Sequence, residues 1–158
     1  MIMTDTGNWV QIVRDFDAPI DAIWPMWTDA DAFASWYGPK GFSIPTSKID
    51  ASVDGTRLLM MQSPDGSMKM WFTGVFKEVD APNRLVYTDA MCDETGKVLT
   101  PQELGMPDNI PTETEVHVDL TEQNGKTRMT MTHKGVPKGS PGEGGWMQAF
   151  DKLAEQLG

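Results

Sequence analysis

The hydrophobic positions in the last part of the chain follow a helical period. Apolar side chains recur at Trp146, Ala149, Phe150, Leu153 and Leu157, and these spacings of three and four place them on one side of a helix. Such a helix is marginally stable in water on its own, and most of the preceding chain has the pattern of strands. We therefore expect a sheet that packs against this helix.

The N-terminal part has a mixed pattern. It predicts, in order, a strand over Asn8–Phe16, a helix over Ile20–Trp27, and a second helix from an N-cap at Thr28 or Asp29 to Trp36. A proline deep inside a helix costs about 3 kcal/mol. The first helix is therefore expected either to begin late enough to keep Pro25 in its opening turn or to be kinked there.

From Phe42 onward, short apolar segments alternate with turn sequences. The predicted strands are Phe42–Ser52, Thr56–Gln62, Met68–Val79, Arg84–Cys92, Thr112–Gln123 and Lys126–Lys134. The polar segment Asp93–Pro111 is long for a connection in a compact domain, and such connections are often functional lids.

The dipeptide Asn124-Gly125 is the strongest hairpin signal in the chain. A two-residue turn there pairs Gln123 with Lys126. Counting outward then pairs Leu120 with Met129, Val118 with Met131, and Val116 with His133. These six residues share one face, which we expect to receive the C-terminal helix.

The predicted order is one strand, two small helices, a meander of about six antiparallel strands and a long helix, which is an α+β fold. At 158 residues the chain is expected to form a single domain, 1–158, with one core. A curved sheet diverges from a straight helix, so we expect a cavity between them.

Composition limits the functions open to this chain. A net charge of -10 repels phosphate backbones and anionic membranes, so neither nucleic acid nor membrane is expected as a partner. Cys92 is the single cysteine, the first residues lack a secretory signal, and no apolar run approaches the roughly 20 residues that span a bilayer. These features predict a cytoplasmic protein. They leave open whether it is a monomer or a homodimer.

Residues with catalytic chemistry are sparse. His133 is the only histidine on the predicted inner face, where it is either a general base or polar anchor, or a structural residue. With His117 on the other face and one distant cysteine, no metal site is expected, and no cofactor either. Gly125-Lys-Thr127 is a turn and not a phosphate loop. The acidic neighbours of Cys92 raise the pKa of its thiol, so covalent catalysis is not supported.

Aromatic and thioether side chains are numerous and suit an adaptable apolar pocket. Each of them is equally well explained as core. The proposed ligand-binding set is Trp36, Tyr37, Arg57, Phe72, Phe76, Tyr87, Met91, Met129, Met131, His133, Trp146 and Phe150. The glycine run from Gly135 to Gly145 is interpreted as a flexible entry to the helix, or else as a source of backbone amides for an anion.

Short segments along almost the whole chain resemble the activators of heat-shock protein 90 ATPase, a family within the START-like helix-grip superfamily. The matching pieces are Ala18–Trp24, Trp27–Asp29, Trp36–Pro39, Ile49-Asp50 with Gly55, Ser63–Gly66, Gly74–Val79 with Pro82 and Arg84-Leu85, Thr88–Ala90, Asp93–Gly96, Gly125–Thr127 and Gly145-Trp146. The resemblance implies a helix-grip fold, β-α-α, then a β-meander, then α, with an internal cavity able to hold an apolar ligand.

Two positions depart from the family pattern, Pro25 and Arg57. If Arg57 points inward, its guanidinium enters the cavity and can pair with a ligand carboxylate or phosphate. In the favoured alternative, Leu58 and Met60 face inward and Arg57 faces water, because an unpaired buried charge is costly.

Three functions are compatible with the sequence. The leading hypothesis is a domain that binds a small apolar or aromatic ligand without catalysis. The resemblance also implies a polyketide-cyclase-like enzyme, in which His133 or Arg57 would orient a substrate, or a module that regulates a chaperone ATPase. The chain matches only the C-terminal domain of the eukaryotic activator, which weakens the chaperone assignment.

Overall fold

The fold is described from a computed structural model, which covers residues 8–106 and 110–157. The elements in chain order are β1 (Trp9–Phe16), α1 (Ile20–Thr28), α2 (Ala30–Ala34), β2 (Ser43–Ile49), β3 (Thr56–Gln62), β4 (Lys69–Asp80), β5 (Arg84–Cys92), β6 (Glu113–Gln123), β7 (Lys126–Pro137) and α3 (Pro141–Leu157).

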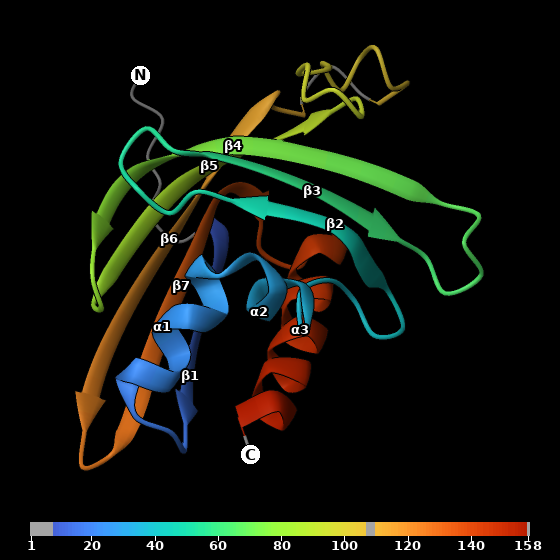
Figure 1. Ribbon diagram of the computed structural model, residues 1–158. Helices are drawn as coiled ribbons and strands as arrows, with labels where there is room; N and C mark the ends of the chain where they lie inside the picture. Colours follow the sequence, from blue (N-terminus) through green and yellow to red (C-terminus); the bar gives the residue numbers. More distant parts are fainter. Residues whose placement is uncertain (1–7, 107–109, 158) are drawn as a thin grey trace.

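The strands form one antiparallel sheet of seven strands in the order β1-β7-β6-β5-β4-β3-β2. Each strand from β2 to β6 pairs with the next in sequence, and β1 pairs with β7 at the other edge of the sheet. The sheet arches over α3, and α1 and α2 lie in the same concavity (Figure 1). The predicted α+β order, with its six-stranded meander, is confirmed.

The last hairpin has the predicted register. Gln123 pairs with Lys126, Leu120 with Met129, Val118 with Met131 and Val116 with His133. Asn124 and Gly125 both have positive φ, as the two-residue turn requires. The apolar members of these pairs are at most 2% exposed. This face therefore forms the floor on which the helices pack.

The two small helices form in the predicted order, with two corrections. Helix α1 begins at Ile20 and continues past Pro25 to Thr28, so the alternative that places Pro25 in the opening turn is wrong. Pro25 is exposed and its carbonyl accepts from the Asp29 amide, which ends α1. The Asp29 carboxylate in turn accepts from the Ala32 amide and caps α2, which stops at Ala34, before Trp36.

Helix α3 begins earlier than the apolar period indicates. Gly142, Gly144 and Gly145 are helical, so the interpretation of the whole glycine run as a flexible entry is wrong. The Glu143 carboxylate reaches back to accept from the Gly139 amide at 2.8 Å, which satisfies a donor at the helix start. A side chain at Gly142 would stand 2.8 Å from Val136 Cγ1, so the absence of a Cβ allows α3 to pack close to the end of β7.

An aromatic cluster fills the space between the three helices. Trp27, at 1% exposure, packs against Phe33, Trp36, Trp146 and Phe150 at ring-centroid distances of 4.9 to 6.2 Å. The helices are therefore joined to one another as well as to the sheet. Within residues 8–106 and 110–157, no helix has the length and apolar character needed to cross a membrane.

Candidate functional site

A cavity of about 580 Å³ lies at the N-terminal end of α3. The sheet supplies one wall, with side chains from five strands, among them Met61, Phe72, Met91 and His133. Helix α3 supplies the opposite wall, from Pro141 to Ala149. The lining consists mostly of aromatic, thioether, proline and glycine residues, so the cavity suits an apolar molecule.

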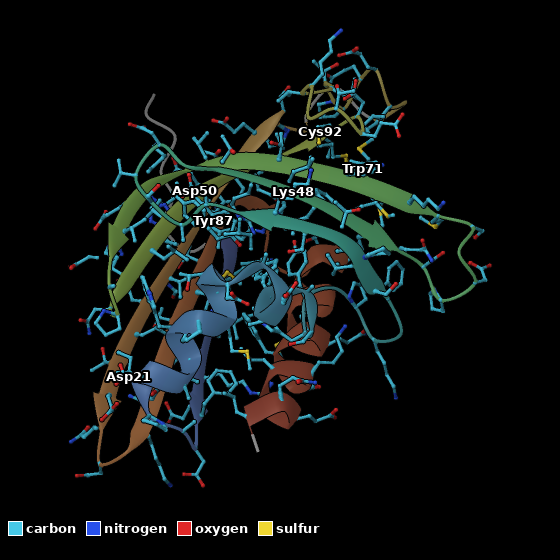
Figure 2. All side chains as sticks on the ribbon, in the orientation of Figure 1. Asp21, Lys48, Asp50, Trp71, Tyr87 and Cys92 are labelled. Atoms are coloured by element: carbon cyan, nitrogen blue, oxygen red, sulfur yellow. The ribbon has the colours of Figure 1, made fainter. Side chains whose placement is uncertain are left out.

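Five of the twelve residues proposed from sequence line this cavity, namely Tyr37, Phe72, Met91, His133 and Trp146. The other seven lie behind its walls, namely Trp36, Arg57, Phe76, Tyr87, Met129, Met131 and Phe150, each at most 2% exposed. The stick view shows how Tyr87 lies on the concave side of the sheet, whereas Trp71 and Cys92 lie near the end of the sheet close to residues 93–106 (Figure 2).

The residues behind the walls have packing roles that explain their position. The Trp36 indole donates to the Met26 carbonyl at 2.9 Å, and its ring lies 5.9 Å from that of Phe150. Phe76 and Tyr87 pack edge to face at 5.7 Å on neighbouring strands. The sequence left open whether these residues line a pocket or fill the core, because it did not show how far α1 and α2 extend beneath the sheet.

The turn after α2 holds Tyr37 in the cavity wall. The Lys152 ammonium donates to the carbonyls of Tyr37 and Pro39 at 3.3 and 3.1 Å, and the Lys40 amide donates to Gln148 Oε1 at 2.8 Å. Three hydrogen bonds thus attach this turn to α3. Tyr37 stacks on Phe33 at 4.5 Å and meets Trp146 edge to face at 5.5 Å, so its ring forms a rigid part of the wall.

His133 is held by hydrogen bonds at both ring nitrogens. The indole N–H of Trp146 donates to Nδ1 at 2.9 Å, and Nε2 lies 2.8 Å from the Thr114 hydroxyl. An indole nitrogen can only donate, so Nδ1 must be unprotonated and the ring proton sits on Nε2. Burial, together with the charge of Arg57, lowers the pKa of His133 to about 4. His133 is therefore a neutral positioning residue that fixes Trp146.

Arg57 points inward, contrary to the favoured expectation. Its side chain is 2% exposed, and Leu59 and Met61, not Leu58 and Met60, share its face. The guanidinium lies over the Tyr87 ring at 3.7 Å and near those of Phe33 and Phe76 at 5.2 and 5.9 Å. Three aromatic faces thus attract the cation and compensate part of its lost hydration. This enclosure by rings from three separate elements was not visible in the sequence.

Asp89 is a charged residue of the cavity lining that the sequence analysis did not predict. It lines the cavity, its side chain is 12% exposed, and its Oδ1 lies 3.9 Å from Arg57 Nη1. Burial raises the pKa of Asp89 to about 6, against the opposing charge of Arg57. A sequence signal was present, because Asp89 alternates with Tyr87 and Met91, which both belong to the proposed ligand-binding set.

The acidic, histidine and cysteine side chains outside Asp89 and His133 are spread over the fold. No group of three or more histidine, cysteine or acidic side chains converges within residues 8–106 and 110–157. Burial and the neighbouring Asp93 raise the pKa of the Cys92 thiol to about 11, in the direction expected from sequence. Cys92 is thus a poor nucleophile at neutral pH.

The long segment between β5 and β6 contributes to the cavity. Pro101, Ile110, Pro111 and Thr112 all line it. The Leu99 amide donates to the Met91 carbonyl at 2.9 Å, which attaches the segment to the cavity end of β5. The central part of the predicted lid, residues 107–109, lies outside the described residues.

A curved antiparallel sheet wrapped around a C-terminal helix, with two small helices and an apolar cavity between them, defines the helix-grip class of α+β domains. Within that class, the chain belongs to the family described as activator of Hsp90 ATPase homolog 1-like proteins, whose model matches residues 17–158.

Solved structures from bacteria share this fold. A protein from Chromobacterium violaceum is 23% identical with a TM-score of 0.77, over 95% of this chain and 96% of that one. The AHSA1 protein from Silicibacter pomeroyi is 20% identical with a TM-score of 0.71, over 94% and 96%. An AHSA1-like protein from Aeromonas hydrophila is 25% identical with a TM-score of 0.66, over 92% and 90%. A search of curated proteins gave no match.

Proposed function

We propose that this protein binds a small apolar ligand in the cavity between the curved sheet and α3. The observation that carries the proposal is the cavity itself, which is bounded on opposite sides by Met61, Phe72 and Met91 of the sheet and by Trp146 of α3. Its volume of about 580 Å³ falls in the usual range for small-molecule sites, about 300–1,000 Å³.

The lining supports a ligand with a planar or flexible apolar body. Aromatic rings offer flat faces for stacking, and thioether side chains adapt to irregular shapes. Met61, Met70 and Met91 stand on three adjacent strands, β3, β4 and β5, and form a thioether surface on the sheet side. Tyr37 and Trp146 lie on the side of the helices, so a ligand would be held between thioether and aromatic groups.

A second candidate function is proton transfer at Asp89, in the manner expected of a cyclase-like enzyme. Asp89 lines an apolar cavity and has a pKa raised to about 6, and general bases work best with a pKa near the working pH. His133 does not serve this role, since both of its ring nitrogens are occupied. An enzyme would convert its ligand, and Asp89→Asn would abolish turnover while binding persists.

The neutral fluorophore N-phenyl-1-naphthylamine tests the binding function. Its emission should rise on mixing with the protein, and at a free concentration of about 100 Kd the free energy of unfolding should increase by about 2.7 kcal/mol. That increase corresponds to a melting temperature higher by roughly 5–10 °C for a domain of this size.

Two variants test whether the probe binds in the cavity. Met91→Trp adds bulk to the lining and should abolish the response. Met147→Trp makes the same exchange at a side chain that is 50% exposed on α3 and outside the lining, so it should leave the response intact. Equal responses of the two folded variants, or no response of the wild type to any apolar probe, would refute binding in this cavity.

A further inference from the structure

We propose that Asp89 recognises the ligand, and that this ligand is a neutral apolar molecule with one hydrogen-bond donor, of the phenol or alcohol class. The inference rests on the proposed binding function and adds the chemistry of the ligand's polar end. Among the described residues that line the cavity, Asp89 is the only carboxylate.

The carboxylate of Asp89 has capacity for a ligand donor. A carboxylate presents about four acceptor positions. Arg57 Nη1 stands 3.9 Å from Asp89 Oδ1, which is within ion-pair range and beyond hydrogen-bond distance. The neighbouring Thr114 hydroxyl donates to the backbone carbonyl of Asp89 at 3.2 Å and not to its side chain. A ligand donor inside the cavity would therefore find a charged acceptor at Asp89.

Arg57 influences which ligand charge the cavity accepts, although it does not contact the ligand. The Arg57 side chain does not line the cavity, it is 2% exposed, and its Nε has no hydrogen-bond partner among the described residues. Aromatic rings on β4, β5 and α2 surround the guanidinium. The cation is therefore confined behind the wall, where it balances the charge of Asp89.

This balance disfavours charged ligands of either sign. An ammonium group at Asp89 would leave the buried site with a net positive charge, and a ligand carboxylate would face the Asp89 carboxylate directly. Both arrangements place an uncompensated charge in an apolar enclosure, which is costly. A neutral hydroxyl donates to Asp89 and leaves the Arg57–Asp89 pair neutral overall.

The groups around Asp89 give the interaction a defined pH dependence. The titratable and charged groups that interact with Asp89 are Arg57 on β3, Tyr87 and Cys92 on β5, Tyr37 after α2, and His133 on β7 through Thr114. Burial raises the pKa of both tyrosines, and that of His133 is lowered to about 4. Between pH 5 and pH 8, Asp89 is accordingly the member of this group that changes charge, around pH 6. Donor binding should strengthen across this interval as the carboxylate ionises.

A series of naphthalenes of similar size tests the inference. 2-Naphthol carries a hydroxyl donor, 2-methoxynaphthalene replaces it with an acceptor only, and 2-naphthoate and 2-naphthylmethylammonium carry opposite charges. Calorimetric titration at pH 8 should show 2-naphthol binding on the order of tenfold tighter than the ether. Both charged analogues should bind more weakly than the ether. At pH 5 the advantage of the hydroxyl should shrink.

The variant Asp89→Asn keeps an acceptor oxygen and removes the charge. It should reduce the preference for 2-naphthol and remove its pH dependence, with binding of 2-methoxynaphthalene unchanged. If this variant fails to fold, the wild-type pH series decides the question alone.

Equal affinity for the hydroxyl and the ether, or tightest binding of 2-naphthoate, would overturn the inference and leave the proposed binding function standing. No binding of any naphthalene would overturn the inference, and it would overturn the proposed binding function as well if N-phenyl-1-naphthylamine also fails to bind.

Discussion

Arg57 is a cation held in place by aromatic rings. Its guanidinium lies 3.7 Å from the centre of the Tyr87 ring, and its single ion-pair partner among the described residues is Asp89. Cation–π attraction in a desolvated site contributes about 2 kcal/mol, far less than the cost of removing an isolated charge from water. The neighbouring Asp89 carboxylate must therefore provide a large part of the compensation. The two residues act as one unit.

Removing the cation should destabilise the protein in a pH-dependent manner. In Arg57→Met, Asp89 loses its counter-charge, and the pKa of Asp89 in the folded state should rise further above the ordinary value of an aspartate. A carboxyl with a raised folded pKa opposes folding above that pKa and is relieved as the pH falls, because the folded state takes up the proton first. Urea unfolding should show a loss of about 3 kcal/mol at pH 8 and a smaller loss at pH 5.

Arg128→Met is the matched control for Arg57→Met. Arg128 pairs with Asp15 at 2.8 Å, and both side chains are more than half exposed. An exposed pair contributes little to stability, so this variant should unfold almost as the wild type does at both pH values. A loss for Arg57→Met that is equal at pH 5 and pH 8 would contradict the coupling to Asp89.

His133 should remain neutral well below the usual range for histidine. Burial and the nearby charge of Arg57 lower the pKa of His133 to about 4, and a proton on Nδ1 would also break the hydrogen bond from the Trp146 indole. The unfolded chain takes up this proton near pH 6.5, so the contribution of His133 to stability is complete above pH 6.5 and falls as the pH drops toward 4. Asp89 has the opposite effect on stability below about pH 6, because its raised pKa lets the folded state take up a proton before the unfolded chain does.

Proton NMR of the ring measures the His133 titration directly. We expect its Hε1 resonance to shift with a midpoint near pH 4, and His117→Gln assigns the second histidine signal. A midpoint near 6.5 would show that the Trp146–His133–Thr114 chain is not maintained in solution.

The residues around the cavity differ in how readily a sequence shows them. The inward direction of Tyr87, Met91 and His133 follows from strand alternation and could be predicted. The burial of Arg57 could not, because it depends on rings from α2, β4 and β5 that only the fold brings together. Asp89 was open to prediction by the same alternation, but a charged residue between apolar ones appears solvent-directed when no partner is visible.

Helix α3 joins the fold and the site, because its first turns line the cavity and its later turns fill the core. The cavity lining includes Pro141, Gly142 and Gly145 of α3. Phe150 and Leu153, further along the helix, are fully buried in the core. The N-terminal half is poor in helix-forming residues. Its helical state depends on packing and on the Glu143 bond to the Gly139 amide.

Two glycines in the first turns of α3 should respond oppositely to alanine. A Cβ at Gly144 would meet nothing within 4 Å, and the φ of this residue is not positive, so Gly144→Ala should stabilise the protein by about 0.5–1 kcal/mol. A Cβ at Gly142 would lie 2.8 Å from Val136 Cγ1, so Gly142→Ala should destabilise it. Thermal unfolding of both variants beside the wild type measures the difference, and stabilisation by both would show that α3 does not pack against Val136.

The β6–β7 hairpin and helix α3 show how accurately the bounds of an element can be predicted from the sequence. The hairpin at Asn124-Gly125 was predicted to the residue, because turn chemistry and face alternation agree there. The start of α3 was placed five residues late, at Trp146 and not at Pro141, because glycines carry no apolar period and have low helix propensity. Tertiary contacts with β7 and the turn after α2 decide the conformation of those residues.

The sheet of this molecule is open, so its two edge strands, β1 and β2, must avoid pairing with other copies of the chain. Strand β2 contains Pro45, which has no N–H to offer, at a register irregularity against β3, and the exposed Lys48 follows it. Helix α2 lies beside this edge, where Ser47 donates to the Ala30 carbonyl at 2.8 Å. At the other edge, β1 carries charges in ion pairs, Arg14 with Asp151 and Asp15 with Arg128.

These features predict a monomer. The net charge of -10 adds repulsion between copies, so sedimentation at tens of micromolar should give a mass near 17.5 kDa. Replacing Pro45 and Lys48 together by threonine restores a donor and removes the edge charge, and this variant should self-associate in a concentration-dependent way. Lys48→Thr alone makes the same change in net charge but keeps Pro45, and it should remain largely monomeric. A wild-type dimer at this concentration would contradict the prediction.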